Sequence, residues 1–209
     1  MAASKEHVFV VDDDVDVLES VTMLLRTEGW SVRAYQEPVQ FLETVTPEDA
    51  GCLVLDVRLP GMDGLALQAA LQERGIEMPI VFISGHGDIP MAIQAVQAGA
   101  LDFLEKPFSD DALIERVQAA LDADRERRDK AAGRDAIEQR LKELTDRERE
   151  VMEKILLGHL NKVIAYDLGL SVRTVEVHRA RILEKLQVRN AQEMVRQVLS
   201  SRPYKDWLL

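Results

Sequence analysis

Acidic, hydroxyl and basic side chains stand at the ends of short apolar runs in the first part of the sequence. The first run ends in three aspartates at positions 12–14, the third in Asp56, the fourth in Ser84 and the fifth in Lys106. The carboxyl ends of parallel strands meet at one edge of a sheet, where ligands bind. We therefore expect carboxylates, a hydroxyl and an ammonium to gather at this edge.

This set of groups suits the transfer of a phosphoryl group to a carboxylate. Asp56 would be the nucleophile, and Asp12 and Asp13 would hold Mg²⁺, a hard cation that prefers oxygen ligands and keeps several waters. Lys106 would contact one phosphoryl oxygen, and Ser84 would donate a hydrogen bond to another. The metal would offset the charge of the carboxylates and of the transferred group.

Two other acidic motifs fit the aspartates at 12–16 less well. A calcium loop that begins at position 12 needs Gly in its sixth place and Glu in its twelfth, where this sequence has Val17 and Met23. A phosphatase of the Asp-x-Asp type needs Thr or Val two residues after its second Asp, and that position holds Asp16. The aspartates therefore favour the magnesium site.

Strand-like and helix-like stretches alternate as far as residue 121. The expected strands are 8–12, 31–35, 52–56, 80–84 and 101–105, and the expected helices are 16–28, 37–45, 63–74, 88–98 and 110–121. The central strands are apolar without alternation, as strands covered on both faces should be. The pattern predicts an α/β domain with a five-stranded parallel, doubly wound sheet.

Length and composition indicate a globular protein with either one large domain or two small ones. The chain has 209 residues, of which 46% are hydrophobic and 30% charged. Apolar runs are far shorter than the roughly 20 residues that span a bilayer, and residues 1–7 lack the apolar core of a signal peptide. We therefore expect a cytoplasmic protein with no membrane partner. Its single cysteine, Cys52, has apolar neighbours that favour a buried strand position over a reactive thiol.

Charge is divided unevenly along the chain. Residues 1–121 hold 7 basic and 21 acidic residues, a net charge of −14. Residues 122–143 balance, and residues 144–209 hold 12 basic and 9 acidic residues, a net charge of +3. The asymmetry predicts two different tasks, cation binding in the acidic half and contact with a polyanion in the basic half.

The three charge regions set the predicted domains at 1–121, 122–143 and 144–209. The middle region mixes charges, which predicts a helical linker that continues the preceding helix. Its end carries apolar residues at helical spacing, Ile137, Leu141 and Leu144. This stripe could pair two subunits or dock on a neighbouring domain.

After position 144 the pattern predicts an all-α domain of four helices, near 146–157, 161–168, 172–187 and 191–200. Gly169 is placed to end the second of these helices, and Ser171 is a suitable N-cap for the third. The two helices with their tight turn predict a helix-turn-helix, whose second helix enters the major groove of DNA.

Helical geometry separates two faces of the helix after Ser171. Val175, Ile182 and Leu186 share the predicted core side. Val177 and Ala180 point outward and suit close approach to bases and thymine methyl groups. The candidate DNA contacts are Lys162, Arg173, Thr174, Glu176, Val177, Ala180, Arg181 and Lys185.

The types of these side chains suggest different contacts with DNA. Arg173 and Arg181 suit phosphate or guanine, while Lys162 and Lys185 suit phosphate. Glu176 could accept a hydrogen bond from cytosine or only be solvated. His178, nearer the core margin, could be structural or contact DNA.

These motifs resemble a known family over nearly the whole chain. Residues 6–122 resemble the receiver domain of two-component response regulators, because the acidic, Ser and Lys-Pro motifs match in order and spacing. Residues 144–199 resemble the output domain of the FixJ/NarL (LuxR-type) family through Leu-Thr-Asp-Arg-Glu-Arg-Glu-Val, Asn-Lys-x-Ile-Ala and Arg-Thr-Val-Glu-Val-His-Arg. Gly-His-Gly-Asp at 85–88 and Asp-Phe-Leu-Glu-Lys-Pro-Phe at 102–108 resemble the FixJ subgroup.

The resemblance implies a flavodoxin-like receiver and further roles for its residues. The backbone carbonyl of Arg58 would be a third protein ligand of Mg²⁺, and the Lys106–Pro107 bond would be cis. Phe103 holds the family's switch position, where it would turn inward as Ser84 moves toward the phosphate; a Phe is otherwise more often a core residue. The tail at 202–209, with Trp207, lies outside the resemblance.

The resemblance also implies a function for the whole chain. A histidine kinase would donate the phosphoryl group, and the surface of the fourth helix, fifth strand and fifth helix would then form a homodimer that binds promoter DNA. RNA polymerase is a candidate partner, and activation is expected, with repression left open. The receiver would act only on its own phosphate, so we expect no enzyme. Two other hypotheses are a signalling module without DNA binding and a free-standing phosphatase.

Overall fold

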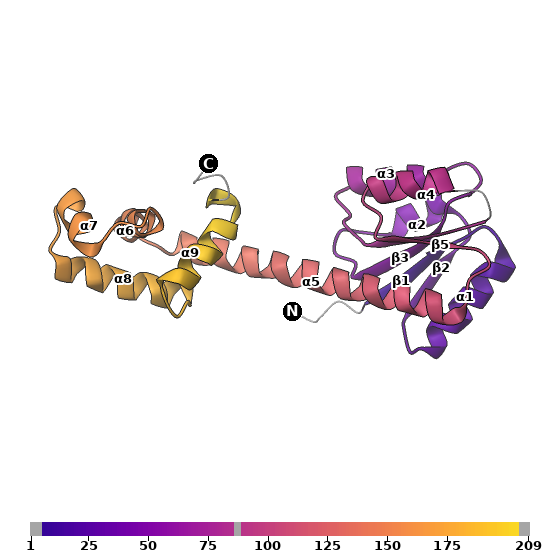
Figure 1. Cartoon of the computed structure of the whole chain (residues 1–209), viewed down its shortest axis with the longest axis horizontal. Coiled ribbons are helices and arrows are strands. Elements are labelled where there is room, and N and C mark those ends of the chain that lie inside the picture. Colours follow the sequence, from indigo (N-terminus) through magenta and orange to yellow (C-terminus); the bar gives the residue numbers. More distant parts are fainter. Residues whose placement is uncertain (1–5, 86–88, 205–209) are drawn as a thin grey trace. The chain divides into compact units, whose positions relative to one another are not determined.

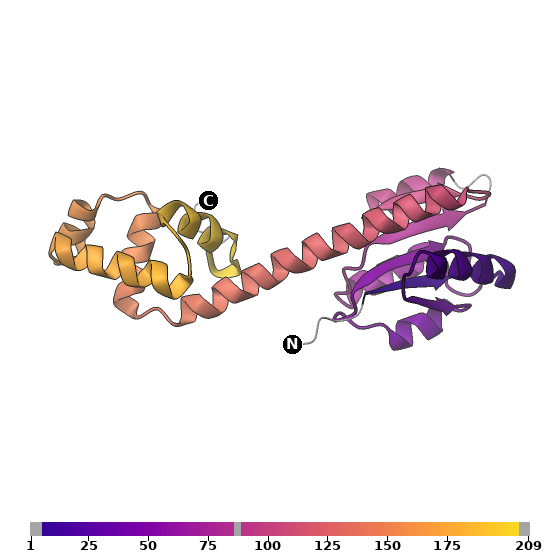
Figure 2. The ribbon, with the colours of Figure 1, turned by 90° about the horizontal axis from the view of Figure 1, so that it is seen from below.

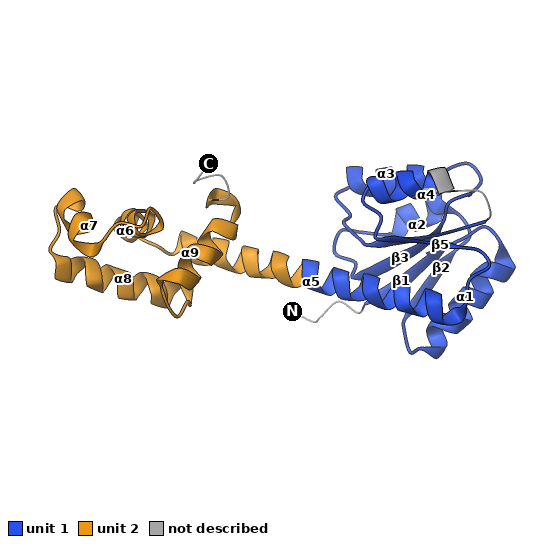
Figure 3. Cartoon of the chain, in the orientation of Figure 1, with its two compact units in different colours: residues 1–127 blue, residues 128–209 orange. Residues whose placement is uncertain are grey.

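The computed structural model describes residues 6–85 and 89–204, which form two compact units (Figure 3). The first unit spans residues 1–127 and the second 128–209. Most of the Gly-His-Gly-Asp string and all of Trp207 lie outside the described residues. No helix in the described part is both long and apolar enough to cross a membrane.

The first unit is built around a five-stranded parallel sheet with the strand order β2-β1-β3-β4-β5 (Figure 1). Its strands are β1 (His7–Val11), β2 (Val32–Tyr35), β3 (Gly51–Asp56), β4 (Ile80–Ser84) and β5 (Asp102–Glu105). Its helices are α1 (Val15–Thr27), α2 (Pro38–Thr44), α3 (Gly64–Glu73), α4 (Ile89–Gln97) and the first part of α5 (Asp110–Lys142). The predicted doubly wound sheet is confirmed.

Apolar side chains fill both faces of this sheet. Helices α2, α3 and α4 cover one face of the sheet, and α1 and α5 cover the other (Figures 1 and 2). Successive side chains of a strand point to opposite faces, so Phe9 packs under the first three helices, whereas Val8 and Val10 pack under α1 and α5. All three side chains are almost fully buried. Cys52 is buried on the second of these faces, and burial raises the pKa of its thiol, so the expected buried position is confirmed.

The element bounds lie within one residue of the predicted ones, except for α5. The helix predicted over 110–121 and the linker predicted to continue it form this one helix, which runs to Lys142. One buried and one exposed side-chain contact hold the helix beyond 121. Asp124 is 1% exposed, and its Oδ2 accepts a hydrogen bond from the Gly51 backbone N–H at 2.9 Å. Arg125 forms two hydrogen bonds to the Glu6 carboxylate, at 2.7 and 2.6 Å.

The second unit contains the end of α5 and four further helices, followed by one 3₁₀ turn. They are α6 (Asp146–Leu156), α7 (Asn161–Leu168), α8 (Val172–Leu186), α9 (Ala191–Ser200) and η1 (Arg202–Tyr204). Ile137, Leu141 and Leu144 are buried in the core of this unit, so the apolar stripe docks within the unit. Tyr204 of the otherwise unexplained tail is buried there too and donates a hydrogen bond to Glu153 at 2.9 Å.

Local sequence signals fix the ends of the helices in this unit. Thr145 and Glu148 form a capping box at the start of α6. Gly169 ends α7 in the left-handed conformation, with φ 64°. Ser171 caps α8, because its hydroxyl accepts a hydrogen bond from the Thr174 backbone N–H at 3.0 Å. These caps place a tight turn between α7 and α8.

Candidate functional site

Three charged side chains converge at the carboxyl edge of the sheet. Asp12 follows β1, Asp56 ends β3, and Lys106 follows β5. The Lys106 ammonium lies 2.7 Å from Oδ2 of Asp12 and 2.7 Å from Oδ1 of Asp56. One cation is therefore shared by two carboxylates that come from different strands.

Backbone N–H groups hold the remaining carboxylate oxygens. Asp12 Oδ1 accepts a hydrogen bond from the Asp14 N–H at 3.0 Å. Asp56 Oδ2 accepts one from the Arg58 N–H at 2.6 Å. The orientation of both carboxylates is therefore set by the loops that follow β1 and β3, as well as by Lys106.

Burial and charge shift the protonation equilibria of this cluster. Burial raises the pKa of the Asp56 carboxyl, and the nearby Asp12 charge adds to the rise, while Lys106 opposes it. Burial alone would lower the pKa of Lys106, but its hydrogen bonds to the two carboxylates raise it. An additional cation beside two neighbouring buried carboxylates stabilises their ionised forms.

The other predicted receiver residues occupy nearby positions with different environments. Ser84 ends β4 and is fully buried, and its backbone carbonyl accepts a hydrogen bond from the Lys106 N–H at 2.6 Å. Asp13 is next to Asp12 but exposed. Phe103, in β5, is half-buried and packs against the core under α4. The Lys106–Pro107 bond is cis, as the resemblance implied.

The donor atoms fit a magnesium ion that keeps part of its water shell. Within residues 6–85 and 89–204, no three His, Cys, Asp or Glu side chains gather closely enough to hold a metal by themselves. Mg²⁺ is commonly bound through only one or two carboxylates, with waters and phosphate oxygens completing the octahedron. Asp12 and Asp56, which share the Lys106 ammonium, can supply these one or two carboxylates.

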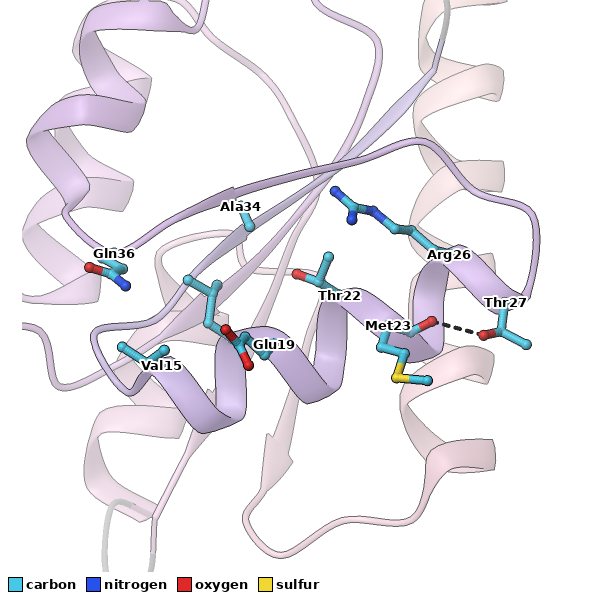
Figure 4. A pocket seen from close by; sticks show the side chains of 9 residues that line it. Val15, Glu19, Thr22, Met23, Arg26, Thr27, Ala34 and Gln36 are labelled. Carbon is cyan, nitrogen blue, oxygen red and sulfur yellow. Dashed lines mark hydrogen bonds between the residues drawn. The ribbon is translucent and has the colours of Figure 1, made fainter.

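Two concave regions lie along α1. A groove of about 430 Å³ between α1 and the start of α5 is lined by Lys106, Pro107 and Phe108, so it borders the cluster at Lys106, while Asp12 and Asp56 do not line it. A cavity of about 510 Å³ lies between α1 and β2, where Val15, Met23 and Ala34 line it (Figure 4). Asp12, Asp56 and Lys106 do not line this second cavity.

The second unit presents the predicted recognition face on α8. Val175, Ile182 and Leu186 are fully buried, which confirms the predicted core side. The exposed residues of the opposite side are Arg173, Glu176, Val177, Ala180 and Arg181. Thr174 and His178 are half-buried, and Lys162 on α7 is exposed.

Lys185 faces a partner inside the protein, unlike the other candidate DNA contacts. Its Nζ lies 2.6 Å from Oε2 of Glu148, which is 3% exposed, and 3.0 Å from the Glu143 carbonyl oxygen. Burial opposes ionisation of Glu148, but Lys185 and the Thr145 N–H lower its pKa overall. Lys185 therefore stabilises the start of α6, and this pairing competes with the predicted contact to phosphate.

Sequence reasoning missed several structural partners of these residues. The capping motif signalled the position of Glu148, but its pairing with Lys185 spans 37 positions and has no local signal. Arg179 donates a hydrogen bond to Oδ1 of Asn161 at 3.1 Å, which ties α8 to α7. This pairing spans 18 positions and also has no local signal in the sequence.

Comparison with known families agrees with the geometry of both units. Residues 8–118 match the response regulator receiver domain, and residues 142–198 match the luxR family of bacterial regulatory proteins. The chain is a two-component response regulator. Its domains imply a histidine kinase as partner and DNA as the target of its output domain, so this response regulator regulates transcription.

Individual relatives align with almost the full length of this response regulator. The transcriptional regulatory protein FixJ of Azorhizobium caulinodans is 44% identical over 192 residues, which cover 92% of this chain and 91% of the relative. The response regulator protein TodT of Pseudomonas putida is 42% identical over 90% of this chain and 83% of its own. The solved structure of the response regulator StyR has a TM-score of 0.80 and 45% identity, and the match covers 93% of this chain and 98% of that one.

Proposed function

We propose that Asp56 accepts a phosphoryl group from a histidine kinase. The observation that carries this proposal is the single ammonium of Lys106 held at 2.7 Å by both Asp12 and Asp56. An Asp56 oxygen would attack the phosphorus as the bond to the donor nitrogen breaks, and the donor imidazole would leave with the electron pair. The groove between α1 and the start of α5 borders Lys106, beside this position.

The residues around Asp56 would stabilise the transferred group. Mg²⁺, when bound by Asp12, Asp13, Asp56 and the Arg58 carbonyl, would neutralise charge on the phosphoryl oxygens. Lys106 would shift from its two carboxylates to a phosphoryl oxygen, and Ser84 would donate a hydrogen bond to another. Each of these contacts favours the phosphorylated conformation, which is what a switch requires.

The phosphorylated conformation would dimerise through α4, β5 and α5. Inward rotation of Phe103 would accompany the movement of Ser84 and repack this face. Apolar side chains already lie exposed there, since Ile93 and Val96 of α4 are 54% and 52% exposed and Leu101 is 43% exposed. Arg116 of α5 also pairs with Asp102 of β5, with a nitrogen–oxygen distance of 2.6 Å.

The dimer would then bind promoter DNA through two copies of α8. Val177 and Ala180 would approach base edges, and Glu176 a cytosine. Arg173 and Arg181 would contact phosphate or guanine. Thr174 at the start of α8 and Lys162 of α7 would contact the phosphate backbone of the DNA. Two-fold symmetry predicts a roughly palindromic site.

We further propose that the protein acts in the cytoplasm as an activator that recruits RNA polymerase. Its receiver would transfer phosphate only to and from its own Asp56, so it would not be an enzyme with a free substrate. The segments 1–121, 122–143 and 144–209 would divide these tasks into switch, linker and DNA-binding domain.

Phosphorylation-dependent dimerisation and DNA binding test the proposal together. We would compare the wild type, Asp56→Asn and the exposed control Asp129→Asn with acetyl phosphate and Mg²⁺. Sedimentation would report the oligomeric state, and retention of genomic DNA fragments at several salt concentrations would report binding. We expect the wild type and the control to dimerise and bind, and Asp56→Asn to remain monomeric. Equal dimerisation of all three proteins would contradict the proposal.

A further inference from the structure

Two glutamines of α3 donate hydrogen bonds to the last carbonyl groups of α4. Nε2 of Gln68 lies 3.3 Å from the Ala95 oxygen and 3.1 Å from the Ala98 oxygen. Nε2 of Gln72 lies 2.7 Å from the same Ala98 oxygen. The end of a helix leaves carbonyl groups without partners inside the helix. From a neighbouring helix, the glutamines satisfy one such group, at Ala98, and add a second donor to the Ala95 oxygen, which also accepts a hydrogen bond from the Ala100 N–H at 2.9 Å.

The Gln68 side chain is buried for these contacts. The residue is 2% exposed, and its Oε1 has no hydrogen-bond partner within the described residues. Burying an unpaired amide oxygen is unfavourable. An apolar side chain at this position would avoid that penalty, so the donor contacts to α4 give the amide a physical reason to be there.

Packing alone holds this end of α4 weakly. Ala95 is the only fully buried side chain among those described in α4. A cavity of about 590 Å³ lies beside the helix end, and Gln68, Gln72 and Gly99 help to line it. Gly99 has a φ of 92°, which turns the chain out of the helix toward β5. The amide hydrogen bonds therefore bridge a region that side chains do not fill.

We propose that Gln68 and Gln72 are positioning residues that fix the C-terminal end of α4 as a pivot. The proposal rests on the function proposed above, in which phosphorylation of Asp56 draws Ser84 at the end of β4. Because the C-terminal end of α4 is fixed, the movement of Ser84 is converted into a tilt of the helix about Ala98. The tilt changes the exposed face that carries Ile93 and Val96, while the end of α4 and its link to β5 stay in place.

Hydrogen exchange tests the pivot without phosphorylation. We would compare the full-length wild type with Gln68→Leu, Gln72→Leu and the control Gln40→Leu, an exposed glutamine of α2. Loss of a contact worth about 1 kcal/mol predicts roughly fivefold faster exchange in peptides covering 95–101 for both α3 variants. The control should match the wild type. Because Gln72 is exposed, its variant keeps the test valid should Gln68→Leu fail to fold.

A conservative variant separates the donated hydrogen bond from general packing. Gln72→Lys retains a side-chain donor within reach of the Ala98 oxygen. We expect its exchange at 95–101 to stay within about twofold of the wild type, well below the roughly fivefold rise expected for Gln72→Leu. Equal acceleration by Gln72→Lys and Gln72→Leu would overturn the proposal, as would unchanged exchange in both α3 leucine variants.

Phosphorylation then tests the switch itself. With acetyl phosphate and Mg²⁺, the Gln68→Leu/Gln72→Leu protein should gain the same phosphate as the wild type but dimerise at least about tenfold more weakly. Full dimerisation would overturn the pivot. Failure of the wild type to become phosphorylated would instead contradict the proposed function. The hydrogen-exchange result would still show whether Gln68 and Gln72 fix the C-terminal end of α4.

Discussion

The ammonium of Lys106 lies 2.7 Å from Oδ1 of Asp56, although 50 positions separate the two residues. The parallel order of β3, β4 and β5 brings them together, because each strand ends at the same edge. The same ammonium also contacts Asp12. The stability and the chemistry of the receiver therefore depend on one shared cation.

Replacement of this cation should destabilise the receiver when metal is absent. Lys106→Met would leave the buried carboxylates of Asp12 and Asp56 facing each other. We expect a loss of about 2–3 kcal/mol in the free energy of unfolding in EDTA, because hydrogen bonds to charged groups are lost. Urea unfolding would measure it, with the exposed Lys162→Met of α7 as control. A loss equal to that of the control would show that the shared contact is not stabilising.

The raised pKa of Asp56 predicts the sign of a pH dependence. The ordinary value is 3.8, and burial raises the value in the folded state, so the folded protein holds this proton more tightly than the unfolded chain. This contribution to stability is present below pH 3.8 and is lost as the pH rises through the raised pKa. Asp56→Asn should thus gain stability relative to the wild type as the pH rises. A constant difference between pH 4 and 7 would contradict this.

Magnesium binding should depend on the proposed ligands Asp12 and Asp13 more than on acidic residues outside the ligand set. Mg²⁺ stabilises the folded protein according to its affinity. We expect Asp13→Asn to reduce the rise in melting temperature produced by Mg²⁺ and Asp12→Asn to abolish it. The exposed Asp16→Asn should respond as the wild type does. An unchanged response of Asp13→Asn would remove this residue from the proposed ligands.

The strand ends could be predicted from sequence because each functional residue there adjoins a short apolar run. The contacts of Asp124 could not. Asp124 lies among alternating acidic and basic residues, where most carboxylates are solvated. Its partner, the N–H of Gly51, is 73 positions away and becomes a neighbour only after the sheet and α5 have packed.

Asp124 should matter for stability far more than a neighbouring aspartate does. Asp124→Ala would leave the buried Gly51 N–H unsatisfied and would remove the pairing with Arg127 at 2.6 Å. We expect a loss of about 2–3 kcal/mol, against less than about 1 kcal/mol for the exposed Asp122→Ala. Urea unfolding followed by Trp30 fluorescence in a Trp207→Phe background would measure both. Equal losses would argue against the buried contact.

Lys162 and Lys185 should differ in their effect on DNA binding. Lys162 is exposed on α7, whereas Lys185 pairs with the buried Glu148. We expect Lys162→Ala to lower the slope of log affinity against log salt by about 1 and Lys185→Ala to leave that slope unchanged. Lys185→Ala should instead lower the thermal stability of the DNA-binding domain. A reduced salt slope for Lys185→Ala would show that Lys185 contacts phosphate.

The helix-turn-helix shows the same limit of sequence reasoning. The core side of α8 could be predicted because Val175, Ile182 and Leu186 recur at helical spacing. The partner of Lys185 could not, since an outward lysine near DNA and a lysine folded onto Glu148 look alike in sequence. Tertiary pairing decides between them.

The position of the phosphoryl group is the most direct test of the central claim. The wild type would be treated with acetyl phosphate and Mg²⁺, and the acyl phosphate would be reduced with borohydride, which converts the modified aspartate to homoserine. Peptide mass spectrometry would then locate the product. We predict homoserine at position 56 in the wild type and in Asp129→Asn, and none in Asp56→Asn. Modification at another aspartate, or phosphorylation that survives Asp56→Asn, would contradict the account.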